Sequence, residues 1–189
     1  MNEVLKNIYS RASVRRYKAD KVPEKDVREI IRAGFHAANG MNRQALEFAV
    51  LENKDAIKKY NRKAILLYAD MIRAAGHSNP MVENMVKNPE ADIFHDAPML
   101  VFVFANPGAV TPVEDGSLAV GNMMLAAHSM GYGTCFIGFA AGLGNDKEFR
   151  NELNVPEGHR YLACMTLGKP DGSMGTHSRS EVKILSWVK

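Results

Sequence analysis

The chain has 189 residues, of which 46% are apolar and 24% are charged, and its formal net charge is +3. These proportions are ordinary for a globular domain and exclude a disordered chain, a coiled coil and a collagen-like chain. The small net charge and the 8% aromatic content also argue against a nucleic-acid-binding protein. The length predicts a single domain that spans residues 1–189.

The cysteine content and the longest apolar run bear on the cellular compartment. Cys135 and Cys164 are too few for a disulfide framework, which fits a reduced, cytoplasmic protein. The most apolar run, residues 97–105, has about half the length that a membrane-spanning helix needs. The N-terminal residues also lack the continuous apolar core of a signal peptide. We therefore predict a cytoplasmic protein without a membrane segment.

The hydrophobic pattern predicts a mixed order of helices and strands, without the regular βαβ alternation of a doubly wound fold. The expected elements are, in chain order, a helix over 3–10, a helix over 23–38, a strand over 47–52, a helix over 56–75, a short helix within 76–94, a strand over 99–105, a helix over 115–130, a strand over 134–137, a helix over 146–153 and a strand over 161–167.

Three of these elements carry a prediction beyond their type. The first helix is expected to turn Val4, Leu5 and Ile8 inward. The strand over 99–105 is apolar throughout, which predicts burial on both faces. The helix over 115–130 is apolar nearly all round, which predicts that it is buried either in a core or against a partner chain.

Familiar catalytic motifs are absent or out of place. Residues 131–136 suggest a dinucleotide-binding turn, but Phe136 stands at the third glycine position, and the glycines follow a helix rather than a strand. The six histidines are scattered and none has zinc-site spacing. Cysteines in core strands are usually inert, and His95 beside Asp96 is more typical of a loop contact than of a catalytic dyad. The sequence predicts neither a metal site nor a protein nucleophile.

Four segments are candidates for ligand binding, and each has a purely structural alternative. If residues 11–16 are extended, Arg11, Ser13 and Arg15 project to one side and form a phosphate site, whereas the alternative is a solvated basic loop. The amides of residues 39–44 suit the polar edge of a heterocycle, or they cap the preceding helix.

The other two segments lie in the C-terminal half. At residues 136–139 the backbone beside Gly138 can approach a planar ring, or the segment is simply the end of a strand. Residues 177–179, from His177 to Arg179, either close a phosphate site from a distance or belong to a solvated tail.

The order of these segments along the chain resembles the nitroreductase family of flavin enzymes. The Arg-x-Ser-x-Arg turn of the family is matched by Arg11, Ser13 and Arg15. The remaining matches are Asn42 and Gln44 before Phe48, the central-helix residues Asp115, Gly116, Ala119, Asn122, Leu125, Ala126 and Ala127, then Gly131, Gly133, Ile137, Gly138, Gly168, Pro170 and Arg179. Residues 54–94 match poorly, and the tryptophan common after the glutamine is absent.

The resemblance implies an α+β fold with an antiparallel central sheet flanked by helices, assembled as an intertwined homodimer. It implies two FMN molecules at the dimer interface, each touched by both chains. Residues 1–189 would then form a single nitroreductase-like FMN-binding domain, with 54–94 as a variable helical excursion. Substrate contacts in the family often come from such excursions.

The resemblance also assigns cofactor-binding residues by position. They are Arg11, Ala12, Ser13, Arg15, Asn39, Gly40, Asn42, Gln44, Ile137, Gly138 and Arg179. Arg11, Ser13 and Arg179 are expected to hold the FMN phosphate and ribityl chain, and Arg15 to lie near the N1/O2 edge of the ring. The loop at 39–44 is expected to reach the flavin of the partner chain.

The activity implied is FMN-dependent oxidoreduction by a ping-pong mechanism. NAD(P)H, the co-substrate, passes a hydride to flavin N5 near the Gly138 backbone, and a small-molecule acceptor such as a nitroaromatic compound or a quinone then receives it. No catalytic side chain is implied. The alternatives are a specialised member, such as a flavin reductase or a dehalogenase, and a flavin-binding or sensing protein without NAD(P)H turnover.

Overall fold

The computed structural model describes residues 1–173 and 178–189, and within them an antiparallel sheet has the strand order β1-β2-β4-β3. The strands are β1 (Leu46–Leu51), β2 (Met99–Ala105), β3 (Gly133–Phe136) and β4 (Arg160–Gly168). The helices are α1 (Glu3–Ser10), α2 (Glu24–Phe35), α3 (Lys54–Ala74), α4 (Pro80–Lys87), α5 (Pro112–Ser129) and α6 (Lys147–Glu152), with the 3₁₀ segments η1 (Gly40–Asn42) and η2 (Gly138–Asn145).

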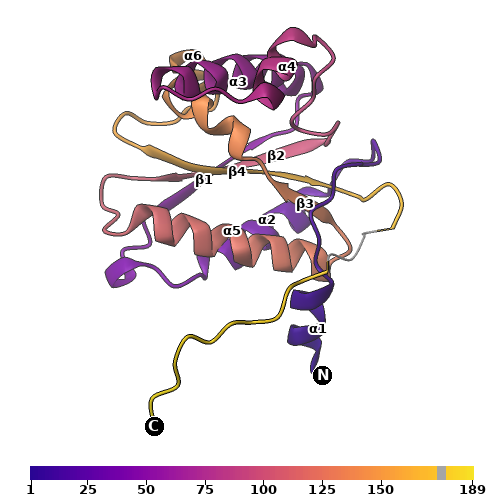
Figure 1. Ribbon diagram of the computed structural model, residues 1–189, viewed down its shortest axis with the longest axis vertical. Coiled ribbons are helices and arrows are strands. Elements are labelled where there is room, and N and C mark those ends of the chain that lie inside the picture. Colours follow the sequence, from indigo (N-terminus) through magenta and orange to yellow (C-terminus); the bar gives the residue numbers. More distant parts are fainter. Residues whose placement is uncertain (174–177) are drawn as a thin grey trace.

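The sheet is the middle of three layers (Figure 1). Helices α3, α4 and α6 lie over one face, and α2 and α5 lie over the other. Helix α1 lies beside one end of α5, and residues 178–189 run away from the layers as an extended tail. The predicted antiparallel sheet flanked by helices is therefore confirmed.

Strand β2 is buried on both faces, as its unbroken apolar run predicted. Met99, Val101 and Val103 belong to the core cluster that includes α2 and α5. Leu100 and Phe102 belong to the cluster on the other face, with α3 and η2. Because successive side chains of a strand point to opposite faces, this one strand contributes to both halves of the core.

Helix η2 is an element that the sequence pattern did not predict. Its Gly142 packs against Leu67 of α3, and a Cβ at that glycine would lie 2.6 Å from the Leu67 Cβ. Gly144 lies equally close to Tyr161 of β4. The segment lies between α3 and the sheet. Its path is therefore determined by neighbours distant in the sequence, and not by a local repeat of apolar residues.

The predicted orientation of α1 is wrong, because the helix has no buried residue. Val4 is 66% exposed, and Leu5 and Ile8 are also exposed. The amphipathic pattern is present, but α1 packs only on the end of α5, where Asn7 Nδ2 donates to the Leu125 carbonyl at 3.0 Å. Within residues 1–173 and 178–189, no element covers the apolar face of α1 closely enough to bury it.

Candidate cofactor site

The segment after α1 runs along the edge of β3. Ser13 forms a parallel bridge with this strand. The side chain of Ala12 is buried, whereas Arg11 and Ser13 are half-buried and Arg15 is exposed. The alternation predicted for an extended segment is therefore present, with Arg11, Ser13 and Arg15 on the outer side. At Ala12, which faces the core, only the backbone is available to a ligand.

Arg11 and His128 bring unpaired polar atoms together at the C-terminal end of α5. Arg11 Nη1 and His128 Nδ1 are buried and have no hydrogen-bond partner among the described residues. On the other side of the imidazole, Nε2 lies 2.8 Å from the Ser10 hydroxyl. Burial, and after it the charge of Arg11, lowers the pKa of His128. Unpaired buried polar atoms are costly, so this corner suits an anionic group such as a phosphate.

A cavity of about 530 Å³ lies at the end of β3, and we call it the β3 cavity. It brings together three predicted residues, Arg15, Ile137 and Gly138. Phe136 and Phe139, from the candidate segment 136–139, also line it. The other lining residues were not predicted to bind a ligand, and they are Tyr68, Met81, Met85, Ala91, Asp92, Ile93, His95 and Cys135. Several come from the 54–94 excursion, whose sequence carries no ligand-binding motif, so only their convergence in space identifies them.

The walls of the β3 cavity are mostly apolar and aromatic. Tyr68 and Phe139 meet edge to face, with ring centroids 5.0 Å apart. Phe136 is 49% exposed and therefore belongs to the cavity wall rather than to the core. A Cβ at Gly138 would have no neighbour within 4 Å, so the backbone there is open. Such a cavity suits a planar ring, because flat apolar walls bind its faces and a few polar groups orient it.

Arg15 and His95 form the polar end of the β3 cavity. His95 has a φ of 60°, a left-handed conformation that is costly for a residue with a side chain. Burial lowers the pKa of His95; the charge of Asp92 opposes this effect and that of Arg15 adds to it. At neutral pH the fixed charge of Arg15 therefore lies beside a neutral imidazole. A fixed positive charge here favours a ligand that carries or develops negative charge.

The predicted amide loop lies at the other end of α5. The Gly40 N–H donates to Asp115 Oδ1 at 2.9 Å, and the Gln44 N–H donates to Asn39 Oδ1 at 3.0 Å. Asn42 and Gln44 both have a φ of 51° and exposed side chains. The Asn39 side chain thus braces the loop from within, while Asn42 and Gln44 remain accessible.

One chain does not bring all the predicted residues together. Ser10, next to Arg11, contacts His128 in the last turn of α5, whereas Gly40 contacts Asp115 in its first turn. Positions 115 and 128 are 13 residues apart on α5, which corresponds to about 20 Å along a helix. The loop and α1 accordingly lie at opposite ends of α5 (Figure 1).

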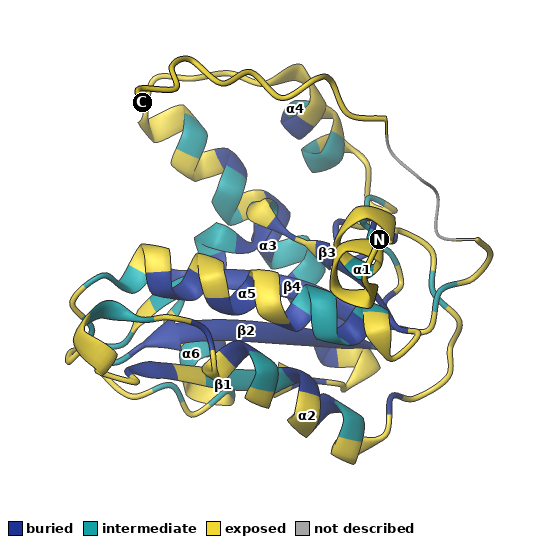
Figure 2. Cartoon of the chain, turned by 90° about the horizontal axis from the view of Figure 1, so that it is seen from below, coloured by how far each residue is buried: buried dark blue, intermediate teal, exposed yellow. Residues whose placement is uncertain are grey.

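Arg179 lies in the exposed tail and forms no hydrogen bond or ion pair with the described residues. Its predicted neighbour His177 lies outside the described residues. Figure 2 shows that the tail is exposed along its length, as is much of α1. Large apolar side chains are unusually frequent in it, and they are Val182, Ile184, Leu185, Trp187 and Val188.

Within residues 1–173 and 178–189, no helix is long and apolar enough to cross a bilayer. Nor do these ranges contain a group of three or more His, Cys, Asp or Glu side chains that could hold a metal ion.

Comparison with known proteins gives a consistent result. Residues 8–169 match the model of the nitroreductase family. Among solved structures, a nitroreductase with bound FMN from Bacteroides fragilis has a TM-score of 0.86 and 26% identity, with 100% of both chains covered. An FMN reductase of Bacillus subtilis is 28% identical over 90% of this chain and 67% of its own. An iodotyrosine deiodinase of Thermotoga neapolitana is 25% identical over 92% of both chains.

Proposed function

The chain belongs to the nitroreductase family, and from that premise we propose that it is an FMN-dependent oxidoreductase. It takes a hydride from NAD(P)H and passes it to a small-molecule acceptor such as a nitroaromatic compound or a quinone. The observation that carries the proposal is the β3 cavity, where Arg15 and the open backbone of Gly138 share one apolar, ring-sized space.

The residues present fit FMN at both ends of the molecule. The buried, unpaired Nη1 of Arg11 and the half-buried Ser13 suit the phosphate. Ile137 and the bare backbone of Gly138 suit the face and edge of the ring. Arg15 lies four residues after Arg11 and lines the β3 cavity, so the segment 11–15 runs from the phosphate corner to the ring-sized space and would hold both ends of FMN.

Bound FMN would supply the hydride chemistry between NAD(P)H and the acceptor, in a ping-pong sequence. Arg15 would hold the ring at the polar end of the β3 cavity, where its charge favours a ring that gains negative charge. The open backbone at Gly138 would offer its N–H as a hydrogen-bond donor to the ring edge, at the N5 position that the proposal implies. Ile137 and Phe139 keep water from one face, and the neutral imidazole of His95 adds no second positive charge beside Arg15.

We further propose that the active unit is a homodimer. The loop at 39–44 lies about 20 Å along α5 from the corner at Arg11, so it completes this site only when a second copy supplies it. Exposed apolar side chains on α1, on α5 (Leu118 is 51% exposed) and on the tail offer the surface for that contact. In the dimer, the tail brings Arg179 to the phosphate corner. The free cysteines fit a cytoplasmic location for this protein.

The visible absorption spectrum of the purified protein tests the function. We expect flavin bands near about 370 and 450 nm that NADH or NADPH bleaches without oxygen, and that a quinone or a nitroaromatic compound restores. Bands that neither nucleotide bleaches would support a flavin sensor instead. No band after incubation with FMN would overturn the proposal.

Reductive dehalogenation is a second candidate, and it is supported by the similarity to the iodotyrosine deiodinase. The aromatic wall formed by Tyr68, Phe136 and Phe139 suits a halogenated ring. Iodide release from 3-iodotyrosine by the reduced protein would support this activity. Reoxidation by quinones without iodide release would exclude it.

A further inference from the structure

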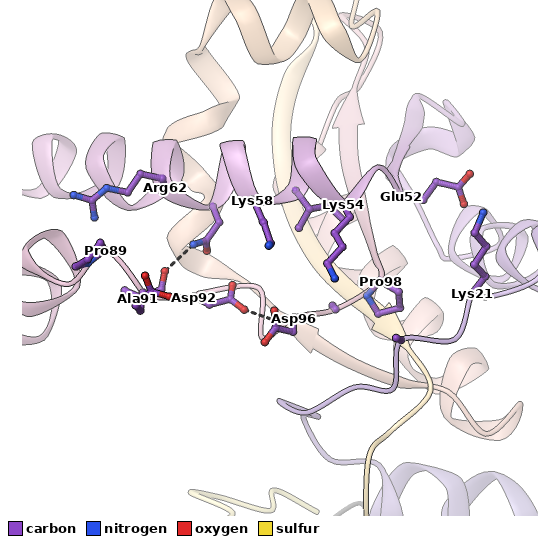
Figure 3. A pocket seen from close by; sticks show the side chains of 15 residues that line it. Lys21, Glu52, Lys54, Lys58, Arg62, Pro89, Ala91, Asp92, Asp96 and Pro98 are labelled. Atoms are coloured by element: carbon purple, nitrogen blue, oxygen red, sulfur yellow. Dashed lines mark hydrogen bonds between the residues drawn. The ribbon is translucent and has the colours of Figure 1, made fainter.

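A second cavity, of about 720 Å³, lies between the first turns of α3 and the loop before β2 (Figure 3). We call it the α3 cavity. None of the residues that the sequence predicted to bind FMN lines it. It meets the β3 cavity at Ala91 and Asp92, which line both. The two cavities are therefore neighbours on either side of the segment around Ala91 and Asp92.

One wall of the α3 cavity is a row of cations. Lys54, Lys58 and Arg62 follow one another every four residues, which places them on one face of α3 over about 12 Å. Figure 3 shows Lys54 and Lys58 extending from the helix toward the opposite loop. Neither lysine forms an ion pair within the described part of the chain. Their charges are thus available to a ligand.

The opposite wall carries carboxylates on a loop that is held in place. Asn61 of α3 donates to the Ala91 carbonyl at 2.7 Å and accepts from the Ile93 N–H at 2.8 Å. The Asp92 carboxylate accepts from the backbone N–H of Asp96, which orders the turn. The Asp96 carboxylate forms no ion pair with α3, so charges of opposite sign face each other across the open cavity.

This arrangement matches the chemistry of a nucleotide. Phosphate oxygens pair with ammonium and guanidinium groups. Ribose hydroxyls donate to carboxylates, as they do in dinucleotide-binding folds. A ligand with both kinds of group uses both walls, whereas a simple anion would be repelled by Asp92 and Asp96. The cavity volume also lies in the range of small-molecule sites.

We propose that the α3 cavity binds the adenosine diphosphate half of the nicotinamide co-substrate, while the nicotinamide half enters the β3 cavity. Lys54 and Lys58 hold the diphosphate, and Asp96 accepts from a ribose hydroxyl. The molecule crosses from one cavity to the other beside Ala91 and Asp92. The inference rests on the proposed function and specifies where the hydride donor is recognised.

Binding of ADP-ribose to the FMN-loaded protein, measured by isothermal titration calorimetry, tests the cavity without any turnover. Wild-type protein is expected to bind it, and the double variant Lys54→Gln/Lys58→Gln to bind at least about tenfold more weakly. Lys25→Gln, at an exposed position of α2, removes one lysine charge away from both cavities and should bind as wild type does. Equal binding by the double variant and wild type would overturn the inference.

Steady-state kinetics with two hydride donors separates this inference from the proposed function. Reduced nicotinamide mononucleotide lacks the adenosine half, so the double variant should raise the KM for NADH about tenfold and leave that for the mononucleotide unchanged. An equal change for both donors, or none, would overturn the role of the α3 cavity. Failure of both donors to bleach the flavin, with ADP-ribose binding intact, would overturn the proposed function and retain the nucleotide site.

Discussion

Strand β2 and the C-terminal tail are both rich in large apolar residues, but only β2 buries them. Every residue of β2 is buried, whereas Leu185 is 100% exposed and Trp187 is 76% exposed. β2 lies between β1 and β4 with helices over both faces, so its own chain supplies all of its neighbours. Residues 178–189, the tail, have no such neighbours in the part of the chain that the structure describes. The comparison separates apolar residues that stabilise the single chain from those that need a second surface.

The predicted cofactor site likewise has one part inside the packed chain and one part beside an exposed surface. The β3 cavity is formed by packed elements of one chain, from Arg15 to Gly138. The phosphate corner at Arg11 lies instead beside α1, which has no buried residue. If a partner chain covers α1, cofactor binding and assembly stabilise each other, because FMN then binds the assembled form better than the free chain.

The largest expected effect is a loss of stability when a buried side chain of β2 is removed. Phe102 is fully buried and meets Phe149 edge to face, with centroids 4.8 Å apart. Phe102→Ala should lower the free energy of unfolding by about 3–5 kcal/mol, because it removes buried area and leaves a cavity. Urea unfolding at fixed protein concentration measures it. An unchanged midpoint would mean that this side of the sheet is not tightly packed.

Removal of the tail tests whether its exposed apolar residues contact a partner chain. A chain that ends at Arg179 loses Val182, Ile184, Leu185 and Trp187. We expect the dimer dissociation constant to rise at least about a hundredfold, since burying even two such side chains contributes several kcal/mol. Sedimentation velocity measures the change, and circular dichroism should remain that of the full chain. Unchanged association would place the tail outside the interface.

Substitution of Arg11 tests the proposed phosphate site at the C-terminal end of α5. Arg11→Ala should raise the Kd for FMN by about tenfold to a hundredfold, because a charge-assisted phosphate contact is lost. Arg16→Ala is the matched control, since that side chain is 81% exposed and pairs with Asp171. Fluorescence titration of FMN measures both. Equal affinities for the two variants would remove Arg11 from the site.

The smallest expected effect is a change in stability when the exposed carboxylate of Glu148 is neutralised. Hydrogen bonds from Lys59 and Lys63 lower the pKa of Glu148 from 4.5 to about 2. A pKa that is lower in the folded state stabilises the protein above about 4.5, and this contribution disappears as the pH falls toward about 2. Glu148→Gln should therefore be slightly less stable than wild type near neutral pH, and the difference should have nearly vanished at about pH 2. Urea midpoints across this pH range measure the difference, and a constant gap would contradict the assignment.

The candidate site was only partly predictable from the sequence. Arg11, Ser13 and Arg15 follow from alternation in an extended segment, and the structure has that alternation. Tyr68 and Met85 line the same cavity as Gly138, but they belong to helices in a segment without a recognisable motif. Their role depends on how α3 and α4 pack over the sheet, which no local pattern encodes.

By itself, the sequence determined the type and order of the main helices and strands, because their periods of two and about 3.6 residues are local properties of the backbone. It also indicated the family, through spaced motifs such as Asn42 and Gln44. The apolar run of β2 also predicted its burial, but tertiary structure alone decided that the apolar face of α1 is left bare. It also decided that two cavities meet at Ala91 and Asp92. The physical reason is that burial and cavities depend on contacts between segments far apart in the chain.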